Sequence, residues 1–154
     1  MWMKKRLLIV YHSQSGATAR LAAAVCEGAR REDGVEVILR RAWDAGMDDL
    51  LQCDAVALGA AENSGSVAGA MKDFLDRTYY PAQPRQLNLA YGLFISAGND
   101  GRGAVAQMQR ILSGYPLKQV CEPLICRGEV NPQALARCEE LGQTLAAGLA
   151  FGIF

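Results

Sequence analysis

Small and hydroxyl-bearing residues gather in the stretch "HSQSGAT" (residues 12–18), between an apolar run and a segment with a helical pattern. The hydroxyls of Ser13, Ser15 and Thr18 can donate hydrogen bonds, and the first N–H groups of a helix have no partner within it. With the open backbone of Gly16, these donors form a neutral cradle suited to a phosphate monoester. The alternative is an ordinary helix N-cap, for which serine and threonine are favoured without any ligand.

The same stretch excludes several other phosphate-using classes. It has neither the Gly-Lys-Ser/Thr of a Walker A loop nor the G-x-G-x-x-G fingerprint of dinucleotide-binding proteins. It lacks the cysteine and arginine of small tyrosine phosphatases, and His12, Ser13 and Gly59 stand where a phospho-receiver domain needs acidic residues. His12 borders the cradle, where it either contacts a ligand or is a hydrogen-bonded residue at the end of a strand.

Short apolar runs alternate with helical patterns along the chain, which predicts a parallel sheet covered by helices on both faces. The last run contains Pro123, which must lie at an edge or a bulge. The predicted strands are residues 6–11, 35–40, 54–60, 91–97 and 118–126, and the predicted helices are residues 17–31, 47–53, 67–78, 103–115 and 131–150.

In such a sheet the ligand crevice lies beyond the carboxyl ends of the strands, where the strand order reverses. The loops after the first, third and fourth predicted strands are therefore the candidate binding loops. They are "HSQSGAT" (12–18), "AENSGSV" (61–67) and "AGNDGRG" (97–103).

These loops resemble a known family. The segment "SQSGATARLA" (13–22) resembles the phosphate loop of flavodoxin-like proteins. The segments "DAVALGAAENSGSVAGAMKDFLDRTYYP" (54–81) and "YGLFISAGNDGRGAVAQMQRIL" (91–112) are similar to the second and third flavin loops of short-chain FMN proteins and NAD(P)H-dependent FMN (quinone) reductases. The resemblance implies an α/β fold, a three-layer flavodoxin-like sandwich whose five-stranded parallel sheet has the order 2-1-3-4-5, in a single domain over residues 1–154.

The resemblance also implies which residues contact FMN. The ring-facing loops carry no aromatic residue, whereas flavodoxins commonly stack one on each ring face, so the ring is expected to be partly open to a substrate or a neighbouring subunit. The cofactor-binding residues implied are Ser13, Gln14, Ser15, Gly16, Ala17 and Thr18 for the phosphate, Glu62, Asn63, Ser64 and Gly65 along the isoalloxazine ring, and Gly98, Asn99, Asp100, Gly101 and Arg102 on its other side.

The function favoured by these features is that of an FMN-binding redox protein in which the flavin carries the chemistry and no side chain is catalytic. The leading hypothesis is an NAD(P)H-dependent reductase of quinones or flavins, with NAD(P)H as a transient donor. The alternatives are a flavodoxin-like one-electron carrier that docks on a redox partner protein, and a flavin-free scaffold. Because the 16 Lys and Arg balance the 16 Asp and Glu, a steering field is absent, which favours the reductase.

Charge and cysteine usage limit the partners and the location. The zero net charge argues against nucleic acid and membrane surfaces as partners. The apolar run at residues 7–11 is too short for a signal or spanning segment, so a cytoplasmic location is expected. The C-terminal stretch (145–154) is apolar, as expected of a segment that packs within the chain or against a second copy in a homo-oligomer. The five cysteines are scattered along the chain, and there is only one histidine, which predicts reduced thiols and no metal site. The cysteines are Cys26, Cys53, Cys121, Cys126 and Cys138.

Overall fold

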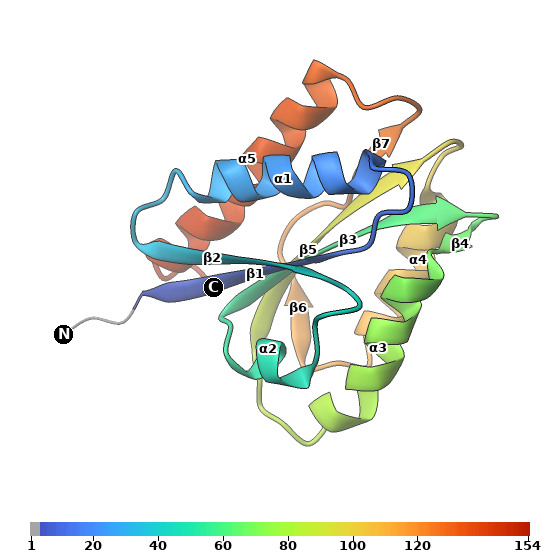
Figure 1. Cartoon of the computed structure of the whole chain (residues 1–154). Coiled ribbons are helices and arrows are strands. Elements are labelled where there is room, and N and C mark those ends of the chain that lie inside the picture. The colour runs from blue at the N-terminus through green and yellow to red at the C-terminus, as the bar shows by residue number, and fades with distance from the viewer. Residues whose placement is uncertain (1–3) are drawn as a thin grey trace.

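A parallel sheet with helices on both faces forms the centre of the computed structural model, which describes residues 4–154. Helices α1 and α5 cover one face, and α2, α3 and α4 cover the other (Figure 1). The strands are β1 (Lys5–Tyr11), β2 (Val35–Arg41), β3 (Ala55–Asn63), β4 (Ser66–Val67), β5 (Leu89–Ala97), β6 (Leu117–Gln119) and β7 (Leu124–Arg127). The helices are α1 (Ala17–Ala29), α2 (Met47–Leu51), α3 (Gly69–Ala82), α4 (Arg102–Leu112) and α5 (Pro132–Ala150).

The predicted strand order 2-1-3-4-5 is confirmed. Strand β5 corresponds to the fourth predicted strand, and β6 and β7 share the position of the fifth. The observed order is β2-β1-β3-β5-β6, and β7 also pairs with β5 in parallel. The single strand predicted at residues 118–126 is wrong, because the chain leaves the sheet between β6 and β7. Pro123, which has no N–H to donate to a ladder, lies in that interruption.

The second candidate loop is a β-hairpin, which the sequence analysis did not predict. Strand β3 runs on to Asn63, and β4 pairs with it antiparallel, Glu62 opposite Val67 and Asn63 opposite Ser66. Helix α3 consequently begins at Gly69 rather than at residue 67.

Alternating side chains of the central strands fill the two cores. In β1, Leu7 and Ile9 pack towards α1 and α5, while Leu8 and Val10 pack towards α3 and α4. This two-sided burial explains why the central strands are apolar runs rather than alternating patterns. On the α1/α5 side, the ring of Phe94 in β5 occupies the space that a Cβ at Gly59 would need.

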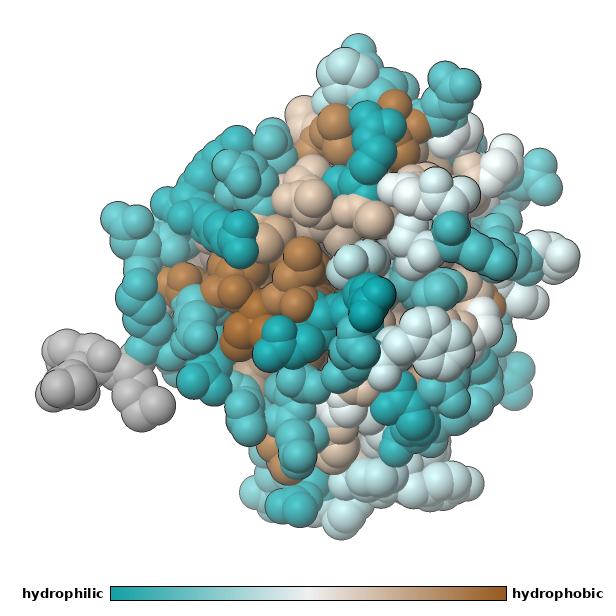
Figure 2. Space-filling view, in the orientation of Figure 1, coloured by the Kyte–Doolittle hydropathy of each residue, from teal (hydrophilic) through white to brown (hydrophobic). Residues whose placement is uncertain are grey.

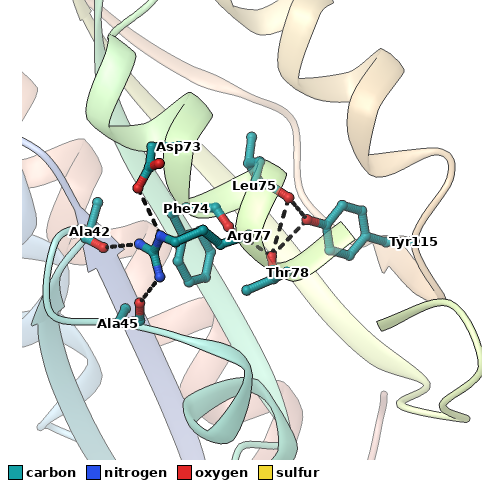
Figure 3. A network of polar contacts seen from close by, with 8 residues as sticks. All are labelled: Ala42, Ala45, Asp73, Phe74, Leu75, Arg77, Thr78 and Tyr115. Carbon is teal, nitrogen blue, oxygen red and sulfur yellow. Dashed lines mark hydrogen bonds and ion pairs between the residues drawn. The ribbon is translucent and has the colours of Figure 1, made fainter. Parts of the chain in front are cut away.

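A polar network fastens α3 to its neighbours (Figure 3). Arg77 donates hydrogen bonds to the carbonyl oxygens of Ala45 (2.8 Å) and Ala42 (2.9 Å), which lie in the β2–α2 connection. On the other side of the helix, the buried hydroxyls of Thr78 and Tyr115 share a hydrogen bond of 2.7 Å. The β2–α2 connection is thereby held in one position against α3.

The surface on the face seen in Figure 2 is mainly hydrophilic and the cysteines are free, as is usual for a globular protein. Figure 2 shows a largely hydrophilic face with apolar surface near its centre. No helix within residues 4–154 is both long and apolar enough to cross a membrane. All five cysteines are free, as predicted, and burial raises the pKa of Cys53 and of Cys138 to about 12. These two thiols are therefore protonated and unreactive at neutral pH.

Candidate functional site

The loops that follow β1, β3 and β5 meet at one edge of the sheet, as expected for parallel strands. The first two loops line a cavity of about 180 Å³. Four of the residues predicted for the site line it: Gln14, Ser15, Thr18 and Asn63. Four others complete the lining: His12, Ala61, Ala68 and Ser96.

The turn into α1 has a glycine at the N-cap position and no side-chain cap within the described part of the chain. Gly16 is the N-cap residue with φ 104°, a left-handed conformation that favours glycine, and a Cβ there would have no atom within 4 Å. No side chain in residues 4–154 caps α1. The simple alternative, in which a serine or threonine caps the helix, is therefore wrong, and the first N–H groups of α1 have no side-chain acceptor among the described residues.

Ser13 stabilises this turn and keeps a proton to donate. Its Oγ accepts a hydrogen bond from the N–H of Gly16 at 3.0 Å, so the hydroxyl proton of Ser13 is not used in that bond. The hydroxyl of Ser15, which is exposed, lines the cavity beside it. Two hydroxyls and a helix N-terminus on one loop fit the oxygens of a phosphate monoester.

Thr18 has a different environment from the two serines. Its side chain is 1% exposed, and its hydroxyl lies 2.8 Å from that of Ser96, which is 6% exposed. This buried bond joins the first turn of α1 to the end of β5 and forms the floor of the cavity. The sequence analysis missed Ser96, although a serine at the end of an apolar strand, next to a candidate loop, is a usable signal.

The β3–β4 hairpin turns at Ser64 and Gly65. Both have positive φ, 51° and 78°, as in a type I′ turn. The carboxylate of Glu62 accepts a hydrogen bond from the N–H of Ala104 at 3.1 Å, near the start of α4. Glu62 thus ties the hairpin to α4, a role that the sequence did not indicate.

A second hydrogen bond connects the same two elements. The side-chain oxygen of Gln107 in α4 accepts from the N–H of Val67 in β4 at 2.8 Å. Gly103 permits the close approach, because a Cβ there would overlap the carbonyl oxygen of Gly65. The hairpin and the start of α4 are therefore held together next to the cavity.

The third loop lies beside the cavity rather than in its lining. Gly98, Asn99 and Asp100 are exposed, and Gly101 is the N-cap of α4 with φ 74°. Asp100 accepts from the N–H of Arg102 at 3.0 Å and forms an ion pair of 3.5 Å with its guanidinium. Arg102 is thus paired at the surface.

An aromatic side chain stands on the side of the site nearest β2. Trp43, in the β2–α2 connection, is 61% exposed, and its ring lies edge-on to that of His12 with the centroids 6.0 Å apart. The hydrogen bonds from Arg77 to Ala42 and Ala45 hold this connection on both sides of Trp43. The sequence analysis did not single out Trp43.

The fold and the site together define a flavodoxin-like protein. The chain belongs to the NADPH-dependent FMN reductase family, whose model matches residues 39–121. FMN is the cofactor that this membership implies, and the turn into α1, with its uncapped N–H groups and serine hydroxyls, fits a phosphate group. Both resemblances found in the sequence are confirmed.

Similar proteins include both kinds of redox protein considered above. A flavodoxin of Aquifex aeolicus is 38% identical over 46% of this chain and 38% of its own length. An NAD(P)H dehydrogenase (quinone) of Acidithiobacillus ferrooxidans is 33% identical over 47% of this chain and 46% of its own length. The chain thus matches less than half the length of either relative.

Solved structures share the fold over nearly the whole chain. A flavodoxin from the domain Archaea has a TM-score of 0.84 at 23% identity, covering 94% of this chain and 98% of that one. A WrbA-like flavodoxin of Agrobacterium tumefaciens has a TM-score of 0.78 at 20% identity, covering 97% of this chain and 99% of that one.

Proposed function

We propose that the protein is an FMN-dependent oxidoreductase that takes electrons from NAD(P)H and passes them to a quinone or a flavin. The observation that carries the proposal is the character of the two ring-facing loops. Residues 62–65 and 98–102 contain no aromatic side chain, and most of them are exposed. A ring bound between such loops keeps a face on which a nicotinamide can stack.

The proposed role of the chain is to bind and orient the cofactor. Bound FMN supplies the electron-transfer chemistry. The N–H groups at the start of α1 and the hydroxyls of Ser13 and Ser15 hold its phosphate. The hydrogen bonds of Glu62 and Gln107 fix the hairpin against α4, which sets the width of the ring site.

The lining of the cavity supports chemistry carried by the cofactor. Among the described residues that line it there is no carboxylate and no lysine, and His12 is the one titratable side chain. No side chain there is placed as an acid–base pair, so specificity must come from how donor and acceptor fit over the ring.

The remaining parts of the proposal concern the whole protein. We infer a single domain over residues 1–154, a cytoplasmic location, and a small-molecule acceptor rather than nucleic acid or a membrane as partner. The five free cysteines, four of them buried, support the location, because disulfides are rare in the cytosol. A one-electron carrier serving a redox partner protein is the second candidate, favoured by the similarity to the Aquifex aeolicus flavodoxin.

Steady-state assays with both nicotinamides test the proposal. We expect the FMN-loaded protein to oxidise NADPH or NADH when a quinone or free flavin is present. Mixtures that lack the protein, and free FMN at the same concentration, serve as controls for direct reaction. Failure to oxidise either nicotinamide, with FMN bound, would support the carrier instead.

A further inference from the structure

A second cavity lies beyond β7, outside the site described above. Its volume is about 480 Å³, within the range of about 300–1,000 Å³ typical of small-molecule sites. Its polar lining comes from the end of β7 and the start of α5: Arg127, Asn131, Gln133 and Arg137. None of the lining residues is acidic.

The two arginines in this cavity differ from half of the twelve arginines of the chain, which pair with carboxylates. Six arginines form ion pairs with carboxylates: Arg6, Arg31, Arg40, Arg41, Arg77 and Arg102. Within residues 4–154, neither Arg127 nor Arg137 has a carboxylate oxygen within 4.0 Å. The cavity therefore concentrates positive charge in a protein whose net charge is zero.

The backbone orients one of the two guanidiniums. Arg137 donates a hydrogen bond to the carbonyl oxygen of Ile125 in β7 at 3.3 Å. Glu122 and Glu140 line a neighbouring hollow that Arg137 also borders. These carboxylates lower the local potential but do not pair with Arg137, so its other donors remain available.

The cavity adjoins the third ring-facing loop. Ile125 packs against Gly101, where a Cβ would come within 2.7 Å of its Cγ2. The N–H of Gly128 donates to the carbonyl oxygen of Ala97 at 2.8 Å. Strand β7 thus ends beside β5, at the edge of the sheet where the candidate loops meet (Figure 1).

We infer that this cavity binds the 2′-phosphate of NADPH and that Arg127 and Arg137 select NADPH over NADH. This inference rests on the proposed function, because it takes the adenosine end of a donor stacked on the ring to lie along this edge of the sheet. Guanidinium groups match phosphate geometry, often with two parallel hydrogen bonds. In Rossmann-type sites, a carboxylate holds the ribose 2′-hydroxyl of NADH and an arginine accommodates the 2′-phosphate of NADPH, because the phosphate adds negative charge. The described lining of this cavity has two arginines and no carboxylate, which is the composition expected for NADPH.

Binding of two nucleotide fragments tests the inference without turnover. We expect the FMN-loaded protein to bind adenosine 2′,5′-bisphosphate at least tenfold more tightly than 5′-AMP, measured by calorimetry. In the variant carrying Arg127→Ala and Arg137→Ala, the two fragments should bind equally. Arg85→Ala, which removes an exposed arginine from the α3–β5 connection, is the matched control and should leave the preference unchanged.

Kinetics separate this inference from the proposed function. In the double variant, the KM for NADPH should rise at least tenfold while the KM for NADH and both kcat values stay unchanged. Equal binding of the two fragments by the unaltered protein, or a preference that survives in the double variant, would overturn the inference. NADPH oxidation that is indifferent to Arg127 and Arg137 would overturn it while retaining the proposed function. Selective fragment binding without oxidation of either nicotinamide would contradict the proposed function and retain the phosphate site.

Discussion

Replacing Ser15 with aspartate is expected to weaken FMN binding by at least an order of magnitude. Ser15 is exposed and lines the cavity next to Gly16, so the new carboxylate would lie beside the phosphate. Two unit charges of the same sign about 4 Å apart repel by about 1 kcal/mol in water and about 4 kcal/mol near a protein surface. Each factor of ten in affinity corresponds to about 1.4 kcal/mol. Quenching of flavin fluorescence on titration gives the dissociation constants.

The matched control for this change is Ser15→Asn. Asparagine has the size of aspartate without its charge, so it should lose far less affinity. Since Ser15 is exposed, neither variant should alter the free energy of unfolding much. A dissociation constant unchanged by Ser15→Asp would mean that the phosphate does not bind at this turn.

Replacing Phe94 with alanine is expected to lower the free energy of unfolding by about 3–5 kcal/mol. The side chain is fully buried, and its ring fills the space left by Gly59, so that no small rearrangement of β3 closes the resulting hole. Urea denaturation of the unaltered protein and of the Phe94→Ala variant measures this difference in the free energy of unfolding. Tyr80→Ala is the control, because Tyr80 is 77% exposed and its loss should change stability by about 0.5 kcal/mol or less. Similar losses in both variants would contradict this description of the core.

The central strands could be predicted from sequence because burial on both faces leaves an apolar run. The order of these strands came from the family resemblance, since alternation alone gives a parallel sheet without its order. The break between β6 and β7 depends on how each pairs with β5, and Pro123 alone could not give its bounds. The β3–β4 hairpin was missed because β4 has only two residues and the end of β3 that pairs with it, Glu62 and Asn63, is polar. Ser64 is also a less usual residue for a turn with positive φ.

The turn proposed to bind the phosphate was predictable as a candidate site because its hydroxyls and Gly16 are adjacent in sequence. The supporting contacts were not, because each joins residues far apart in the chain. Thr18 and Ser96 are 78 positions apart, and Glu62 and Ala104 are 42 apart. Such hydrogen bonds depend on how the elements pack, which no local pattern encodes.

Parallel titrations of the flavin-free protein with FMN and with riboflavin test the central claim most directly. Riboflavin has the same ring and ribityl chain but no phosphate, so only FMN can use the donors at Ser13, Ser15 and the start of α1. The structure predicts saturable binding of one FMN per chain, with riboflavin at least tenfold weaker. Equal affinities for the two flavins, or no saturable binding of FMN, would contradict the claim that this turn is the phosphate site of a flavoprotein.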